Sequence, residues 1–295
     1  MHDYMRAIGF SYEISRESLK KLLSIAVRDS DEDFVVSEGE DILRVEYFKL
    51  LGKRVGLIVR GTIENVDGTD EIFIDYSVPY LKPIAISSTE KISFTKYAEK
   101  ESYVGICDDY RLGMPLIFYL QNMNSYLAEK DKYENRVIDI LHLSLSALSL
   151  EGSVMMPIEK DHVDIEEERR KKREWENLQR KAKQGDDEAL ESLTIRDMDT
   201  YSLVRKRVQS EDVYSLVDTY VMPFGIENDQ YSILGEIKDV EEEINSITGE
   251  ELYILDIVAN DIFFNVCIHK DDLIGEPEIG RRFKGVIWMQ GNVAF

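Results

Sequence analysis

The feature that most constrains the fold of this chain is a pair of apolar segments near its C-terminus, residues 252–259 and 262–269. Asn260 and Asp261 join the two segments, and both residue types tolerate the positive φ that a two-residue hairpin turn needs. Antiparallel pairing across this turn makes one face wholly apolar, with the pairs Leu255–Val266 and Ile257–Phe264. A slip of one residue would turn that face to solvent, so we expect a fixed register.

The other face of the hairpin mixes apolar and polar residues, including Ile254, Cys267 and Asn265. This mixture suits partial exposure or a second packed element. Further strands are predicted over 232–240 and 283–290, and short strands without a long helix favour a small barrel that closes its own edges. We predict an OB-like barrel. Only four strands are clear, and a strand over 217–222 would supply the fifth.

The pattern of helix-like and strand-like segments in residues 1–160 predicts an α+β domain, in which an antiparallel sheet is accompanied by helices. A short helix ends at Gly9 and a second begins at Ser15, a good N-cap residue. Pro115 suits the first turn of a helix that runs to Leu127. The strand-like segments of this sheet are 42–50, 55–64, 71–78, 91–96 and 102–108.

Residues 137–158 carry the most regular strand pattern of this domain. The apolar positions are odd-numbered up to Leu145 and even-numbered from Leu148, and such a change requires one extra residue. We therefore predict a β-bulge near Ser146 and Ala147.

Residues 161–224 predict a charged helical connector between the α+β domain and the barrel module at 225–295. Acidic residues stand four positions ahead of basic ones, as in Glu176 and Arg180, which supports an exposed helix. Two further helices are predicted over 196–208 and 211–221.

The charge balance restricts the partners of this protein. The chain has 58 acidic and 36 basic residues, a net charge of −22, and the segment 231–295 alone has 13 acidic against 5 basic residues. Such a surface repels polyanions, so nucleic acid and anionic membranes are unfavourable partners. No signal peptide and no apolar run of about 20 residues is present, so we expect a cytoplasmic protein. Cys107 and Cys267 match no paired motif and are expected to be buried thiols.

The candidate catalytic residues are His142, Asp108 and Asp109. His142 lies on a predicted strand beside polar residues, and the two aspartates follow Cys107 at a strand end, where active-site loops often lie. A strand histidine and an Asp-rich turn without any catalytic role would show the same residues. The sequence has no phosphate-binding loop, zinc-protease helix or nucleophile-elbow motif, and we expect no metal and no cofactor.

A basic and aromatic cluster in the barrel is the candidate nucleic-acid site. In an OB-like barrel such a cluster would stack a base and hold a phosphate. Pairing of the arginines with Glu276 and Glu278 explains the same pattern. The residues are Arg281, Arg282, Lys284 and Trp288.

Four segments of the chain have a recognisable sequence: HDYMRAIGF (2–10), EDVYSLVDTYVMPFG (211–225), DQYSILGE (229–236) and GEPEIGRRFKGVIWMQG (275–291). They resemble an uncharacterised family of clostridial bacteria (Firmicutes) catalogued as a domain of unknown function. The resemblance implies a bacterial, intracellular protein, and it brings no activity and no site residue.

Two modules, a charged connector and the lack of a catalytic motif favour a non-enzymatic interaction or regulatory protein with a protein partner. Two alternatives stay open. One is an enzyme or small-molecule binder that uses the first sheet and His142, Asp108 and Asp109. The other is single-stranded nucleic-acid binding by the barrel. No pattern in the sequence indicates the oligomeric state.

Overall fold

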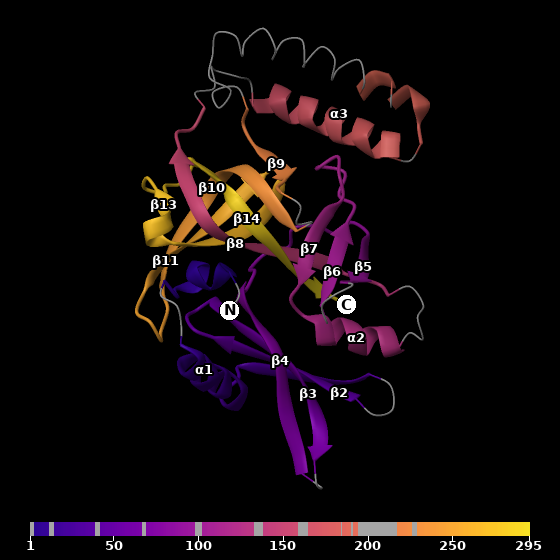
Figure 1. Ribbon diagram of the computed structural model, residues 1–295. Helices are drawn as coiled ribbons and strands as arrows, with labels where there is room; N and C mark the ends of the chain where they lie inside the picture. Colours follow the sequence, from indigo (N-terminus) through magenta and orange to yellow (C-terminus); the bar gives the residue numbers. More distant parts are fainter. Residues whose placement is uncertain are drawn as a thin grey trace.

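The structure, a computed structural model, describes residues 3–11, 15–38, 42–66, 69–97, 102–132, 138–158, 165–183, 185–189, 191–193, 217–225 and 229–295. Strands predominate among the described residues, so the described part of the protein is mostly β, with few helices. Figure 1 shows a barrel in the upper half and a sheet that extends away from it at the lower end. The helix predicted over 196–208 and most of the one over 211–221 lie outside the described residues.

The chain opens with two short helices. The 3₁₀ helix η1 (Asp3–Ile8) ends at Gly9, whose φ of 91° suits glycine. Helix α1 (Arg16–Arg28) begins after Ser15, whose side-chain oxygen accepts a hydrogen bond from the backbone N–H of Ser18. The cap predicted at Ser15 is therefore confirmed.

The N-terminal antiparallel sheet is also confirmed. Its four strands lie side by side in chain order, each antiparallel to the next. They are β1 (Glu32–Glu38), β2 (Ile42–Leu50), β3 (Val55–Val66) and β4 (Thr69–Leu81).

The remaining strands form a single second sheet, in the order β13-β8-β12-β11-β10-β14-β7-β6-β5, and β9 lies beside β10. The strands are β5 (Ile92–Lys96), β6 (Tyr103–Cys107), β7 (Leu116–Leu120), β8 (His142–Met155), β9 (Tyr220–Pro223), β10 (Gln230–Ile244), β11 (Glu251–Ala259), β12 (Ile262–His269), β13 (Leu273–Ile274) and β14 (Arg282–Ala294). The helices of this part are α2 (Met123–Lys132), α3 (Ile165–Lys183) and the 3₁₀ helix η2 (Lys270–Asp272). In the part of the chain that the structure describes, no helix has the length and hydropathy to span a membrane.

Five strands of this sheet, β8, β12, β11, β10 and β14, close into a barrel because β14 also pairs with β8. The predicted hairpin is confirmed in its register and in its turn, where Asn260 and Asp261 have φ of 48° and 62°. The four inward side chains are at most 1% exposed: Leu255, Ile257, Phe264 and Val266.

The fifth barrel strand comes from an unexpected place. The strand predicted over 217–222 forms in part, as β9, but it lies beside β10 and outside the closed ring. The ring is closed by β8, which is parallel to β12 and antiparallel to β14. The barrel is therefore built from strands on both sides of the segment 161–224.

Three local predictions need correction. The segments 91–96 and 102–108 do form strands, but β5 and β6 pair with β7 in the second sheet. The helix predicted from Pro115 is wrong in its first part, because Leu116–Leu120 is strand β7 and α2 begins at Met123. A short, fully apolar run fits a strand and a helix equally well.

The bulge in β8 lies at Leu150, where the pairing steps from Val286–Glu151 to Ile287–Ser149, rather than near Ser146 and Ala147. The reason is that β8 is buried on both faces. Ala147 faces the barrel interior and Leu148 packs in a second core on the opposite side. The change of apolar parity at Leu148 therefore needs no extra residue.

The second core lies between the outside of the barrel and the first sheet. It covers the mixed face of the β11–β12 hairpin, where Leu252, Ile254 and Cys267 are fully buried. Residues of η1, among them Tyr4 and Ile8, form the cover. Of the two outcomes expected for this face, the structure has a second packed element.

Candidate functional site

A buried ion pair joins the first sheet to the rest of the molecule. Arg60 on β3 donates to Glu46 on β2 (Nε to Oε1, 2.7 Å), and both side chains are almost fully buried. Arg60 also donates to the hydroxyl of Tyr119 on β7 and to the carbonyl of Gln121 (2.7 Å). Burial raises the pKa of Glu46, and the attraction of Arg60 opposes that rise. The charges of Arg60 and Glu46 are satisfied by each other and by hydrogen bonds, and these contacts connect the two sheets.

The predicted catalytic residue Asp109 is fully buried in a turn after β6. Arg111 binds both of its carboxylate oxygens, and Ser88 donates to Oδ2 (2.5 Å). Burial acts to raise the pKa of Asp109, but the hydrogen bonds from Arg111 and Ser88 hold it below its ordinary value. A shallow pocket of about 290 Å³ borders Ser88 and Arg111. The carboxylate of Asp109 has no exposed surface to offer to that pocket.

The other predicted catalytic residues are Asp108, which is exposed beside Asp109, and His142 on β8. His142 is half-buried at the start of β8, opposite Ala294. Among the described residues, no hydrogen bond or ion pair connects His142 with Asp108 or Asp109. Burial raises the pKa of the neighbouring Cys107 thiol to about 11, so it stays protonated at neutral pH.

Two of the four residues of the basic and aromatic cluster, Arg282 and Trp288, are buried, and Arg281 and Lys284 are half-buried. Trp288 is buried between Tyr4 and Tyr119, and its ring N–H donates to Asp229 (2.8 Å). Arg282 is buried and donates to the carbonyl of Met156. Arg281 pairs with Glu278 and donates to the backbone carbonyl of Glu276. Lys284 lies within β14, opposite Ser153. Arg281 therefore shows the pairing with the acidic loop, and Trp288 presents no open ring face for a base.

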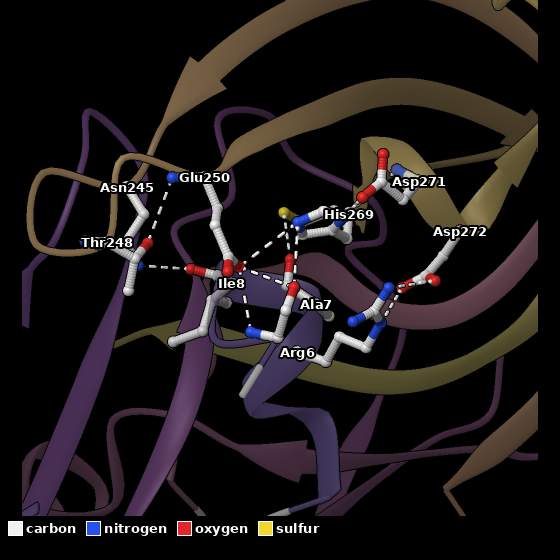
Figure 2. Close-up of polar contacts among 11 residues, drawn as sticks. Arg6, Ala7, Ile8, Asn245, Thr248, Glu250, His269, Asp271 and Asp272 are labelled. Carbon is white, nitrogen blue, oxygen red and sulfur yellow. Dashed lines mark hydrogen bonds and ion pairs between the residues drawn. The ribbon is translucent and has the colours of Figure 1, made fainter. Parts of the chain in front are cut away.

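Ser11, which follows η1, meets a histidine and a glutamate of the barrel region. Figure 2 shows this histidine, His269, and this glutamate, Glu250, beside the end of η1. The Oγ of Ser11 lies 3.3 Å from Nε2 of His269 and 2.9 Å from Oε2 of Glu250. The sequence did not single out this group, because its three residues come from distant segments without a shared motif.

This group has the composition of a catalytic triad but the opposite proton arrangement. Nδ1 of His269 accepts the backbone N–H of Asp271 (3.1 Å), which places the ring proton on Nε2. In a serine nucleophile the hydroxyl donates to the imidazole, whereas Ser11 donates to Glu250. His269 therefore cannot take the proton of Ser11.

Further contacts beside this group hold η1 against the barrel, and Figure 2 shows them. Arg6 makes two hydrogen bonds to Asp272 (2.6 and 2.8 Å). Asn245 donates to the carbonyl of Ile8 (2.6 Å), and the thiol of Cys267 faces the carbonyl of Ala7. The Ser11–His269–Glu250 group is thus part of an intramolecular clamp.

The distal half of the first sheet differs from all these places because several of its apolar side chains are exposed, although Val45 on the same face is buried. Cross-strand pairs set Leu43 beside Ile63 and Ile63 beside Ile72, and the next row contains Val35, Val45, Gly61 and Ile74. Paired residues point to the same side of a sheet. We call the following residues of this face the tip surface: Val35, Leu43, Ile63, Ile72 and Ile74.

Four of the five tip-surface residues are exposed, Ile63 is half-buried, and the surface reaches the edge of the sheet. Val35 is 54% exposed, and Leu43, Ile72 and Ile74 are about 40% exposed. On the other side of β4, Phe73 is exposed as well. β4 pairs only with β3 among the described strands, so its outer edge is unpaired. Figure 1 shows the ends of β3 and β4 extending beyond the other elements.

Acidic residues surround this apolar strand segment. Asp70 and Glu71 precede it, Asp75 follows it, and all three are exposed. In the sequence this segment is visible as three successive apolar residues, 72–74, between acidic ones. It predicted a strand, but whether another element covers that strand is not encoded locally.

The described residues contain no group of three or more His, Cys, Asp or Glu side chains that could hold a metal ion. No curated protein and no solved structure matches the chain. Residues 5–291 match a family model described as a domain of unknown function from an E. rectale gene description, DUF3881, and the chain therefore belongs to this family.

Proposed function

We propose that this protein is a non-enzymatic interaction protein that docks a protein partner through the tip surface. The observation that carries this proposal is the exposure of apolar side chains on both faces of one edge strand, Ile72 and Ile74 on one face and Phe73 on the other. Contiguous exposed apolar surface with a polar rim marks interaction sites in soluble proteins.

The state of the candidate catalytic groups supports this choice over an enzyme. Asp109 is held by Arg111 and Ser88 without exposed surface, and Ser11 is not activated by His269. A general base must reach the proton that it removes. Neither the carboxylate of Asp109 nor the imidazole of His269 is exposed in a pocket where it could reach such a proton.

The barrel itself supports an OB-like assignment with one strand displaced in the chain. In an OB barrel, three strands form a meander, the third pairs in parallel with the fifth, and the fourth bridges the fifth and the first. Here β10, β11 and β12 form the meander, β12 is parallel to β8, and β14 bridges β8 and β10. We infer a circularly permuted OB-like barrel in which the fifth strand, β8, comes first.

This assignment bears on nucleic-acid binding. OB barrels bind oligonucleotides on the face of their second and third strands, which correspond to β11 and β12. In this protein η1 covers that face, and Leu252, Ile254 and Cys267 are buried beneath it. Together with the net charge of −22, this cover supports a protein partner rather than a nucleic acid.

The proposal includes the setting of the interaction. We place it in the cytoplasm, where free thiols such as the buried Cys107 and Cys267 persist. We treat residues 161–224, which contain α3, as a connector.

Photo-crosslinking in the native host tests the proposal. A benzophenone side chain at position 72 is expected to crosslink to one defined protein, which then binds the purified chain and fails to bind the Ile72→Asp/Ile74→Asp variant. Position 279 is the matched control, because Ile279 is also exposed but lies on the barrel. Equal crosslinking from both positions, or binding that survives the double substitution, would overturn the proposal.

A further inference from the structure

The edge of β4 has the properties of a template for an added strand. Ile72, Phe73 and Ile74 present apolar side chains to both faces, and the outer edge of the strand has no partner among the described strands. Natural proteins protect such edges with charged residues, proline, a β-bulge or a covering element. Residues 69–77 contain neither lysine nor proline, and the irregularity in the pairing of β4 lies at Asp75, after the apolar segment 72–74.

The protection that this edge does have is acidic, and it is selective. Asp70, Glu71 and Asp75 flank the apolar segment, and the whole chain carries −22. A second copy would bring acidic residues against acidic ones, which is unfavourable. A cationic strand meets no such barrier, so the same residues that oppose self-association favour a basic partner.

The register of β4 defines the pattern of that partner. Asp70 lies on the face of Ile72 and Ile74, and Glu71 lies on the face of Phe73. Directly opposed residues in a sheet share a face. A strand added to β4 therefore places three apolar residues opposite 72–74, two basic residues opposite 70 and 71, and one basic residue opposite 75.

We propose that the tip surface binds an extended segment of a partner protein, three apolar residues flanked by lysine or arginine, which adds to β4 as a fifth strand of the first sheet. This inference rests on the proposed function and specifies its partner. Backbone hydrogen bonds to β4 supply affinity, and the flanking charges supply specificity.

Two labelled peptides test this recognition by fluorescence anisotropy with the full chain: TKVIVKKT and its acidic counterpart TEVIVEET. We expect the lysine peptide to bind at least tenfold more tightly. The Glu71→Lys/Asp75→Lys variant should reverse this order. Asp187→Lys/Glu188→Lys makes the same charge change at exposed positions outside the first sheet and should leave the order unchanged. Reversal by the control as well would reduce the effect to net charge and overturn the proposal.

A third peptide separates strand addition from other docking modes. N-methylation of alternate residues of TKVIVKKT removes the N–H groups that face one strand edge, and we expect it to weaken binding at least tenfold. Bound peptide should also slow hydrogen exchange of the β4 amides in residues 70–76.

The two proposals fail in different ways. If N-methylation has no effect while Ile72→Ser/Ile74→Ser weakens binding, the tip surface docks a partner without strand addition, and this inference is wrong. If neither change matters, the proposed function fails with it.

Discussion

The hairpins β11–β12 and β3–β4 both carry apolar side chains on their two faces, but among the described residues only β11–β12 is covered along its whole length. In β11–β12 the inner face fills the barrel and the outer face lies under η1, so Ile257 and Ile254 are both fully buried. In β3–β4 the half next to the barrel is buried, whereas Ile72, Phe73 and Ile74 are exposed. The same kind of sequence thus serves internal packing in one hairpin and, in our proposal, a partner in the other.

The largest expected difference between the hairpins is in their tolerance of a charge. Phe264→Asp places a carboxylate inside the barrel, where Phe264 is 1% exposed, and should lower the free energy of unfolding by several kcal/mol. Ile72→Asp at the tip surface should change it by less than about 1 kcal/mol. Urea denaturation of both variants checks this. Similar losses would mean that the tip surface is packed in solution.

The buried ion pair at the base of the first sheet should rank next. Arg60→Leu leaves Glu46 buried without its partner, and we expect a loss of about 3–5 kcal/mol in unfolding free energy. Lys82→Leu is the control, because it breaks the pair Lys82–Glu32, in which both side chains are half exposed. That change should cost less than about 1 kcal/mol. Equal costs in thermal or urea unfolding would show that the junction of the two sheets is hydrated.

Asn265→Asp tests the covered outer face of β11–β12 through pH. Asn265 is fully buried, donates to Asp256 (2.6 Å) and accepts the N–H of Ile84. The substitution places a second carboxyl group beside Asp256, and we expect a loss of about 1–3 kcal/mol in unfolding free energy at pH 7.

The sign of the pH dependence follows from Asp256. Burial raises its pKa in the folded protein, against the opposing effects of Arg54 and Asn265. A carboxyl group with a raised folded-state pKa favours the fold below its ordinary pKa, near 4, and loses that contribution as pH rises through the folded pKa. The variant adds a like charge, so its penalty should shrink as pH falls from 7 towards 4. A penalty that is constant over this range, measured by urea unfolding, would contradict the placement of Asn265 beside Asp256.

The smallest expected effect on stability is at the tip surface itself. Ile72→Ser/Ile74→Ser should change the free energy of unfolding by less than about 1 kcal/mol, because both side chains are already about 40% exposed. The same variant should lose binding of the basic peptide. Loss of stability together with binding would assign these residues to the fold rather than to a partner.

The contrast between the hairpins also explains what the sequence could reveal. The register of β11–β12 was predictable because its strands are adjacent and the two-residue turn at Asn260 fixes their pairing. The fifth barrel strand β8 and the cover by η1 were not, because both contacts join segments far apart in the chain. A strand pattern states which residues share a face and does not state what lies against that face.

The candidate sites illustrate the same limit. The pairing of Arg281 with Glu278 was predictable from their spacing in one loop. The burial of Trp288 against Tyr4 and the burial of Asp109 beneath Arg111 and Ser88 depend on tertiary contacts. The tip surface was visible in the sequence only as a strand, since its exposure results from the absence of a described element over it.

Hydroxyl-radical labelling of the free protein, read by mass spectrometry, tests the central claim most directly. It compares oxidation of Ile72, Phe73 and Ile74 with that of Ile254 and Phe264. We predict rapid labelling of the β4 residues and almost none of the β11–β12 residues. Equal protection of the two hairpins would contradict the assignment of β4 as an open docking strand.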